Sequence, residues 1–305
     1  MVDIKSFFAQ FTKANFYSRV DNVHPLELHM GLDDKGRKSI ELREKFKPRK
    51  VIGTTAIEIN QYKKPEYNII RFSLTDEDMC GLFYTFCEDL IEQTRDPNPD
   101  QTGYTSIINR FHQWKKMFVS SKKDFLSENS IMGLIGEILF MRDSLAMRIG
   151  LSPALKSWSG QELTHKDFSY GDTWAESKAI SRGSSLVKIS SLEQLESDVP
   201  GELAVCSLEK MSTEYNGITL NKLVLETFKK FVSKEDQDLF MSKVALQGYE
   251  YSSYYDNFVY EISSFKRYLV HEDFPRLTPK DVPTAIPKVS YEISLAELAE
   301  FEIAD

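Results

Sequence analysis

The chain has 305 residues, of which 41% are hydrophobic and 28% are charged, and its formal net charge at pH 7 is −8. This length predicts one large or two modest domains, and the composition is that of a globular protein with ample material for a core. The acidic balance excludes a generally basic DNA-coating protein, although a local basic surface can still bind nucleic acid.

Three cysteines, Cys80, Cys87 and Cys206, are too few and too scattered for a disulfide framework or a zinc site. We therefore expect buried thiols in a reducing cytosol. The first residues lack the apolar segment of a signal peptide, and no stretch approaches the roughly 20 apolar residues that cross a bilayer. These features predict a cytoplasmic protein with no membrane contact.

The first quarter of the chain predicts a small β-rich domain over residues 1–75. Residues 1–20 favour a short amphipathic helix and a lead-in. Apolar and polar residues alternate over 26–30 and 39–42, on either side of a turn at 33–36, and β-branched residues are frequent over 51–59 and 68–74. This pattern indicates an antiparallel sheet.

At residue 75 the hydrophobic period changes from that of strands to that of helices. Thr75 is a candidate N-cap with acidic residues after it, and the break at Asp96–Asp100 separates this helix from a second one that ends near Phe118. We predict a helical bridge over residues 76–126. A further helix opens at Ser127 or Ser130.

Residues 127–272 predict an α/β core. After its first helix the order from about residue 155 is strand, strand, strand, helix, strand, helix. The strands are expected near residue 168 and over 174–180, 184–189 and 203–208, the helices from 191 and over 220–232 and 235–245, and two late strands over 258–262 and 265–270. Four prolines then predict an extended segment over 273–305 that packs back on the body, with a strand at 289–295.

Three charged residues stand out in this core. Asp167 closes one predicted strand, and Glu176 and Lys178 lie two apart on the next. Residues at i and i+2 of a strand share a face, so the Glu176 and Lys178 side chains point the same way. Phosphodiester hydrolysis uses carboxylates that hold one or two Mg²⁺ ions, a water nucleophile and a nearby positive charge. Glu137, on the preceding helix, can add a third carboxylate.

The acid-x-Lys pattern has little weight alone, since Asp3/Lys5 and Asp33/Lys35 show it too. Only Glu176/Lys178 follows an acid-bearing strand and a Glu-bearing helix. The alternative is an ion pair on a solvent face, but Trp174, Ala175 and Ile180 predict burial, and buried charges are normally paired or metal-bound.

The order Glu137, Asp167, Glu176-x-Lys178 resembles the PD-(D/E)XK nuclease superfamily. Three stretches resemble more closely a bacterial family of PD-(D/E)XK motif proteins: Met132–Phe140, Ile189–Leu195, and Asp273–Leu277 through Tyr291–Leu295. Such a resemblance implies a restriction-endonuclease-like mixed sheet flanked by helices, preceded here by the β-rich domain and the helical bridge.

The resemblance also implies a function. It implies a Mg²⁺-dependent DNA endonuclease subunit, with Mn²⁺ as a possible substitute, in a bacterial phage-defence or restriction-like system. Asp167 and Glu176 would be metal ligands, with Glu137 as a further ligand, and Lys178 the catalytic lysine. The expected partners are DNA, a methyltransferase, a MutL-like ATPase and a helicase-like protein. The sequence has no Walker motif, so ATP-driven movement would come from those partners.

One residue departs from the superfamily pattern. Lys166 precedes Asp167, where the pattern has proline. This departure and the acidic net charge favour an alternative, a catalytically inactive DNA-binding or scaffold subunit of the same system. An RNA-processing nuclease would share the same site and differ only in its substrate.

Other features allow two interpretations. His165 would share the strand face of Asp167, and Ser190 and Ser191 are candidate caps of a helix whose N-terminus could bind phosphate. Two groups of basic residues fit either a solvated surface or DNA contact: Lys35, Arg37, Lys38, Arg43, Lys45, Lys47, Arg49 and Lys50, and Lys115, Lys116, Lys122 and Lys123. Four tyrosines fit either core packing or base stacking: Tyr249, Tyr251, Tyr254 and Tyr255.

Overall fold

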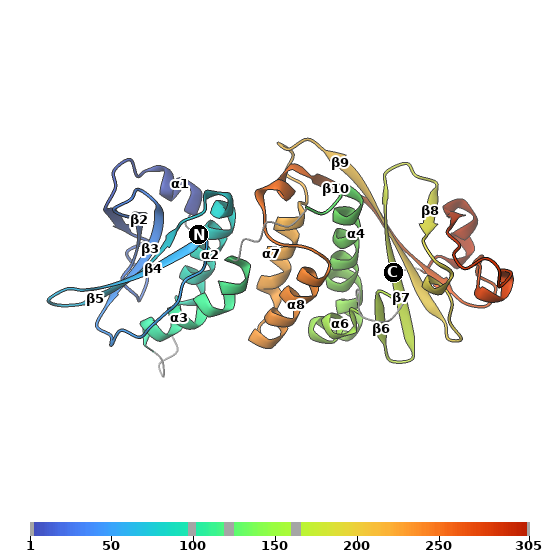
Figure 1. The fold of residues 1–305 in the computed structure, drawn as a ribbon, viewed down its shortest axis with the longest axis horizontal. Coiled ribbons are helices and arrows are strands. Elements are labelled where there is room, and N and C mark those ends of the chain that lie inside the picture. The colour runs from blue at the N-terminus through green and yellow to red at the C-terminus, as the bar shows by residue number, and fades with distance from the viewer. Residues whose placement is uncertain (1–2, 97–101, 119–124, 160–165, 304–305) are drawn as a thin grey trace. The chain divides into compact units, whose positions relative to one another are not determined.

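A computed structural model describes residues 3–96, 102–118, 125–159 and 166–303 (Figure 1). The chain divides into two compact units, residues 1–123 with 250–253, and residues 124–249 with 254–305. The region 76–126, predicted as a helical bridge, falls at this division: α2 (Cys80–Gln93) and α3 (Gly103–Trp114) belong to the first unit and α4 (Glu128–Leu139) to the second. None of the described helices is long and apolar enough to cross a membrane.

The first unit is built on an antiparallel five-stranded sheet in the order β1-β2-β3-β5-β4. Its strands are β1 (Phe16–Arg19), β2 (Leu28–Leu32), β3 (Lys38–Glu44), β4 (Ile57–Lys63) and β5 (Asn68–Leu74). One face is apolar and packs on helices α2 and α3, with the Phe72 ring 6.0 Å from Phe86 and 5.1 Å from Phe111. The helical elements that complete the unit are α1 (Ile4–Ala9), η1 (Glu77–Met79) and η2 (Lys115–Phe118).

Three details of the first unit differ from the sequence prediction. Strand β1 lies in the segment predicted as a lead-in. Strand β4 begins only at Ile57, because Thr54 forms a turn in which its hydroxyl accepts from the Ala56 and Ile57 N–H groups. The cap of the first helical turn is Asp76, whose side chain accepts from Asp78 N–H, and not Thr75.

The second unit contains the predicted α/β core, a mixed sheet in the order β10-β9-β7-β6. Its strands are β6 (Phe168–Tyr170), β7 (Thr173–Ser181), β9 (Gly201–Met211) and β10 (Val259–Val270). Strands β7 and β9 run parallel, and the other two pairs are antiparallel. Helices α4, α6 (Leu151–Ser157), α7 (Leu220–Lys230) and α8 (Lys234–Leu246) lie on one side of this sheet in Figure 1.

Small side chains bring α4 close to the centre of the sheet. The helix packs against β7 at Gly136, where an added methyl group would lie 3.4 Å from the Ala179 Cβ and 3.5 Å from the Ser177 Oγ. Ala204 and Cys206 of β9 are equally small and fully buried. The helix therefore delivers its next residue, Glu137, to the edge of β7.

The opposite face of the sheet carries a second hydrophobic layer. Trp174, Leu203 and Val205 point into it from β7 and β9, and Val187 and Ile293 close it from the outside. Val187 belongs to β8 (Leu186–Ile189) and Ile293 to β11 (Tyr291–Ser294), which pair antiparallel. The strand predicted at 289–295 is thus present and pairs with an earlier strand.

The remaining elements of the second unit are short. They are η3 (Phe140–Leu145, a π-helical turn), α5 (Ala146–Ile149), η4 (Leu192–Gln194), η5 (Ser253–Asn257, whose first residue belongs to the first unit), η6 (Pro279–Asp281) and η7 (Leu295–Phe301). The two late strands predicted over 258–262 and 265–270 are one strand, β10, with a register irregularity between Ile262 and Ser264. Strands of the core were expected from about residue 155, but helix α6 extends to Ser157 and the first of these strands, β6, begins at Phe168.

The three cysteines are free thiols. Cys87 and Cys206 are buried, as expected, whereas Cys80 is half-buried. Burial raises the pKa of the Cys206 thiol to about 12 and holds that of Cys87 well above its usual range. Thiols that stay protonated are poor nucleophiles and poor metal ligands, which agrees with a structural role.

Gly201 supplies a testable close contact beneath the second hydrophobic layer. An added methyl group there would lie 2.2 Å from the Trp174 indole. Gly201→Ala should therefore displace Trp174 and lower the free energy of unfolding by about 1–3 kcal/mol, as overpacking does. Chemical denaturation measures this.

Gly133→Ala is the matched control. An added methyl group at Gly133, within α4, meets no atom within 4 Å. Because alanine has the higher helix propensity, this variant should be as stable as the wild type or up to about 1 kcal/mol more stable. Equal stability of the two variants would contradict the close packing of Gly201 under Trp174.

Candidate active site

Glu176 and Lys178 project from the same face of β7. The Lys178 Nζ donates to the Glu176 Oε1 over 2.8 Å, so the two side chains form an ion pair. Glu176 is only 1% exposed, and its second carboxylate oxygen, Oε2, is buried with no hydrogen-bond partner among the described residues. An unpartnered buried carboxylate oxygen is costly, which marks it as a ligand position for a cation.

Asp167 is held beside this pair by the main chain of β7. Asp167 directly precedes β6. Phe168, the first residue of β6, pairs antiparallel with Ala175 of β7. Extending this register by one residue places Asp167 opposite Glu176. The Ser177 N–H donates to the Asp167 Oδ2 over 2.8 Å. The Ser159 N–H in turn donates to the Asp167 main-chain oxygen over 2.8 Å, which fixes the segment from its other side.

Glu137 reaches the same place from the helix side. Its Oε2 accepts from the Trp158 Nε1 over 2.7 Å and from the Gln247 Nε2 over 3.3 Å. Trp158 is fully buried, and its main-chain oxygen accepts from the Lys243 Nζ. Trp158 and Gln247 therefore orient Glu137, a role that no sequence pattern indicated.

The three carboxyl groups are near enough to perturb one another. Burial, followed by repulsion from Asp167, raises the pKa of Glu176 to about 7, although Lys178 opposes the shift. Burial also raises the pKa of Asp167. The pKa of Glu137 is well above its usual range because of burial and then the charge of Asp167. Gathered acids with raised pKa values are typical of functional sites.

The donor set fits Mg²⁺. This ion prefers oxygen ligands and usually binds through one or two protein carboxylates while keeping several waters. Asp167 and Glu176 supply that pair, and the unpartnered Glu176 Oε2 is the observation that carries the fit. Among the described residues no group of three or more His, Cys, Asp or Glu side chains is arranged to hold a metal. Direct ligation by Glu137 as a third carboxylate stays a prediction.

The family model described as "Putative PD-(D/E)XK family member, (DUF4420)" matches residues 11–296. The chain belongs to this family. No curated protein and no solved structure matches the chain. The family places the chain in the PD-(D/E)XK superfamily, and the mixed sheet flanked by helices is its restriction-endonuclease-like core.

Lys166, which replaces the proline of the superfamily pattern, has defined contacts in this family member. Its Nζ donates to the main-chain oxygens of Glu193 and Gln194 over 2.7 and 2.8 Å and lies 3.9 Å from the centre of the Trp174 ring. Burial lowers its pKa to about 8. Lys166 thus ties η4 to the segment that carries Asp167, and it adds a positive charge beside the acids.

The other candidates near the site have different outcomes. His165 lies outside the described residues. Ser191 precedes η4 without a side-chain cap hydrogen bond, and the Ser190 N–H donates to the Gln194 side chain instead. Because η4 is a single 3-10 turn, it lacks the aligned peptide dipoles with which a long helix would bind phosphate. The predicted capping by Ser190 and Ser191 is wrong, because neither side chain forms a cap hydrogen bond at η4.

The tyrosine cluster is mainly structural. Tyr249 and Tyr255 are buried, and their rings lie 5.6 Å apart. The Tyr254 ring stacks on Phe125 with a centroid separation of 4.3 Å. This arrangement supports core packing over base stacking.

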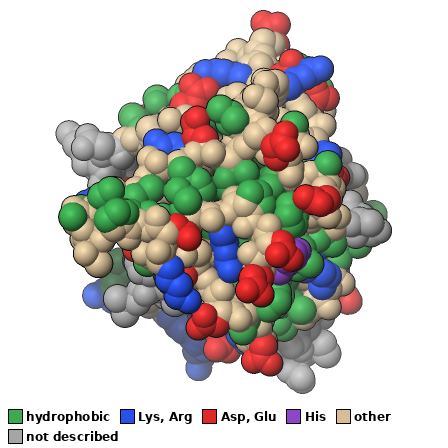
Figure 2. Space-filling view, turned by 90° about the vertical axis from the view of Figure 1, so that its right-hand side faces the viewer, with side chains coloured by type: hydrophobic (Ala, Val, Ile, Leu, Met, Phe, Trp, Pro, Cys, Tyr) green, Lys and Arg blue, Asp and Glu red, His purple; other side chains and the backbone are tan. Residues whose placement is uncertain are grey.

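The surface near the core has no continuous basic track on the face that Figure 2 presents. Acidic, basic and hydrophobic side chains are interspersed there.

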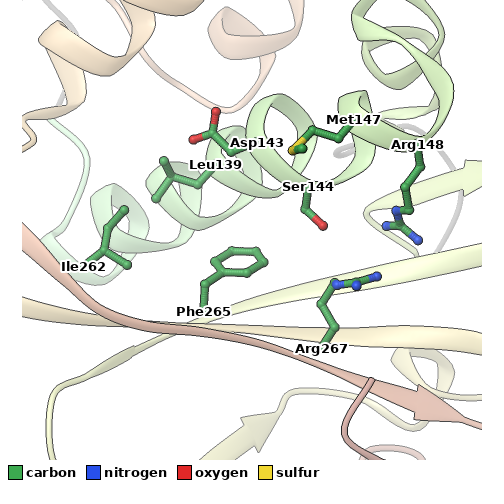
Figure 3. A pocket seen from close by; sticks show the side chains of 8 residues that line it. All are labelled: Leu139, Asp143, Ser144, Met147, Arg148, Ile262, Phe265 and Arg267. Carbon is green, nitrogen blue, oxygen red and sulfur yellow. The ribbon is translucent and has the colours of Figure 1, made fainter. Parts of the chain in front are cut away.

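A pocket of about 480 Å³ lies between the α4–α5 region and β10, with Leu139, Met147 and Phe265 among its lining (Figure 3). None of Glu137, Asp167, Glu176 and Lys178 lines it, so this apolar pocket is separate from the candidate active site.

The raised pKa of Glu176 gives a pH dependence in metal-free protein. Its pKa is about 7 in the folded state against an ordinary value of 4.5. Between these values the unfolded chain releases a proton that the folded chain keeps, so the free energy of unfolding should fall as pH rises from about 4.5 to about 7. The loss should be on the order of 1–3 kcal/mol.

Denaturation in a chelating buffer at several pH values measures this loss. Glu176→Gln should make the profile less steep over that range, and the raised pKa values of Asp167 and Glu137 should keep part of the loss. Glu272→Gln, at an exposed carboxyl of the same unit, should keep the wild-type profile. A Glu176→Gln profile as steep as that of the wild type would contradict the assignment.

Proposed function

We propose that this PD-(D/E)XK family member is a Mg²⁺-dependent endonuclease subunit that cleaves DNA within a bacterial phage-defence or restriction-like system. One observation carries the hydrolytic part of the proposal. Asp167 and Glu176 lie beside each other with an unpartnered buried carboxylate oxygen, and Lys178 contacts Glu176. Carboxylates and a lysine in this arrangement supply what phosphodiester hydrolysis requires.

Each residue has a distinct part in the proposed reaction. Asp167 and Glu176 would hold Mg²⁺, and Glu137 would contribute directly or through water. When bound, Mg²⁺ supplies positive charge that offsets the crowded carboxylates and stabilises the charge that develops on the phosphate. Lys178, kept at the site by Glu176, orients the attacking water and makes its proton more acidic through its positive charge.

The choice of DNA and of the defence setting rests on the family resemblance. The proposed partners, which are a methyltransferase, a MutL-like ATPase and a helicase-like protein, rest on the same resemblance. RNA is the alternative substrate, because the same site would hydrolyse either polymer. Parallel assays with matched DNA and RNA of one sequence separate the two, and faster cleavage of RNA would overturn the DNA assignment.

A second candidate function is an inactive DNA-binding or scaffold subunit. The observation that favours it is Lys166, which stands at the position where the superfamily pattern has a proline and whose ammonium donates to main-chain oxygens of η4. An extra, half-buried positive charge beside Asp167 and Glu176 offsets part of the negative charge that attracts a cation. Both functions require a folded core, so folding alone does not distinguish them. Replacement of single charged residues at the site does, because it should abolish hydrolysis but leave a scaffold intact.

Nicking of supercoiled plasmid in Mg²⁺ or Mn²⁺, with the partner proteins present, tests hydrolysis. Asp167→Asn and Lys178→Met should each lower the cleavage rate by at least about 100-fold, since each removes a charge that acts on the transition state. Asp172→Asn and Lys188→Met are matched controls, because both residues are exposed, on the β6–β7 turn and on β8. These controls should cleave at the wild-type rate.

Phage infection of cells that carry the complete system gives the contradicting outcome. Equal resistance with the wild type, Asp167→Asn and Lys178→Met would exclude hydrolysis as the function and leave the scaffold. Loss of resistance in both variants but in neither control would support cleavage. Thermal melting of each purified variant shows that any loss is not caused by unfolding.

A further inference from the structure

The first unit has a pocket on the face of its sheet that is turned away from α2 and α3. The pocket measures about 560 Å³, within the range of small-molecule sites. Neighbouring strands line it, with Phe16 and Tyr17 from β1, Glu41 and Arg43 from β3, Tyr62 from β4 and Arg71 from β5. All of these residues belong to the first unit, so the pocket is independent of Asp167 and Glu176. We call it the Tyr–Arg pocket.

The floor of the Tyr–Arg pocket is a buried charge cluster. Glu41 is 1% exposed, and it accepts from the Arg71 Nε over 2.8 Å and from the Arg43 Nη2 over 2.7 Å. Glu41 and Arg71 are direct cross-strand partners. A buried ion pair usually stabilises a fold no better than apolar residues of similar size. A cluster of this kind on the face opposite the apolar core is therefore better explained by binding than by stability.

Aromatic rings hold the central arginine. The Arg71 guanidinium carbon lies 4.6 Å from the centre of the Tyr17 ring and 5.0 Å from that of Tyr62. The Tyr17 hydroxyl is itself hydrogen-bonded to the Ser39 hydroxyl at 2.8 Å. Arg71 is thus fixed between two rings and a carboxylate, and its position is set before any ligand arrives.

The rim of the pocket exposes flat apolar surface. Phe16 is 55% exposed and Tyr62 is 39% exposed. Rings that stand in water beside charged groups suit a ligand that has a flat face and polar edges. A nucleobase has this shape, and proteins that bind single strands stack bases on such rings.

The charges around the pocket suit phosphate. Arg43, Lys64 and Arg71 line it against Asp34 and Glu41, and both arginines bond to Glu41. Shortly after Arg43 the chain enters a loop with Lys45, Lys47, Arg49 and Lys50, all exposed, but this loop contacts Tyr104 of α3 and does not line the pocket. The first half of the basic stretch is different, since Lys35, Arg37 and Lys38 pair with acidic side chains. Cations near stacking rings are the usual design of single-strand binding surfaces.

We propose that the Tyr–Arg pocket binds one unpaired nucleobase of a nucleic-acid strand, stacked on Tyr62 and Phe16, with a flanking phosphate on Lys64. A base within a duplex is stacked on its neighbours and cannot enter, so the ligand is a single strand or an extruded base. The pocket gives the protein a recognition site that works without hydrolysis.

Fluorescence anisotropy with a labelled single-stranded oligonucleotide and the full chain tests the proposal. The buffer contains EDTA, so cleavage does not enter the result. The wild type should bind the single strand more tightly than the duplex of the same sequence. Tyr62→Ala should weaken binding about 5- to 100-fold, the range of one lost base stack, and Tyr62→Phe should bind within about twofold of the wild type.

Two further variants sharpen the test. Tyr215→Ala truncates a tyrosine of the second unit that is 40% exposed, and it should bind as the wild type does. Lys64→Ala should reduce the salt dependence of binding, because a lysine on phosphate contributes through counterion release. Thermal melting accompanies each variant.

Several results would overturn the proposal. Equal affinity for duplex and single strand would exclude base insertion, and this comparison needs no variant. Equal weakening by Tyr62→Ala and Tyr215→Ala would exclude stacking in the pocket. Displacement of the oligonucleotide by free mononucleotide at equal or lower concentration would show that the pocket takes a free nucleotide and not a strand.

Discussion

Repulsion among carboxyl groups at the edge of β7 is the constraint on which the candidate active site depends. Burial and neighbouring negative charge raise the pKa values of Glu137, Asp167 and Glu176 together. Such crowding destabilises a fold unless a cation or protons compensate for it. Here Lys178 compensates for part of it through its bond to Glu176. A divalent cation would offset the remainder, and metal binding would then stabilise this unit.

The surrounding fold is arranged to maintain that crowding. Gly136 and the small residues of β7 and β9 let α4 approach closely, and Trp158 and Gln247 then hold Glu137 in place. On the other face, the layer around Trp174 keeps Glu176 out of water. Because the three acids lie on different segments, Glu137 on α4, Asp167 before β6 and Glu176 on β7, the site forms only when the helix and the sheet are assembled together.

Part of this arrangement could be predicted from the sequence. Local signals were sufficient for strands β2, β3 and β5, for α4, and for the common face of Glu176 and Lys178, because strand and helix periods are set by neighbouring residues. The partners of Glu137 could not be predicted, since Gln247 is 110 residues away in the chain. The same holds for Lys166, whose contacts with η4 depend on tertiary packing. The cap predicted at Thr75 was wrong because Asp76, the next residue, caps the turn, and those predicted at Ser190 and Ser191 were wrong because η4 has no side-chain cap hydrogen bond.

The central claim is that Asp167 and Glu176 together bind a divalent cation. The most direct measurement is a crystal structure of the wild-type protein grown with Mn²⁺, in which anomalous scattering locates the ion. The account predicts one anomalous peak at about 2.1 Å from a carboxylate oxygen of each residue, with the Glu176 Oε2 among the ligands. A fully ordered site without such a peak, in a crystal that contains Mn²⁺ at millimolar concentration, would contradict it.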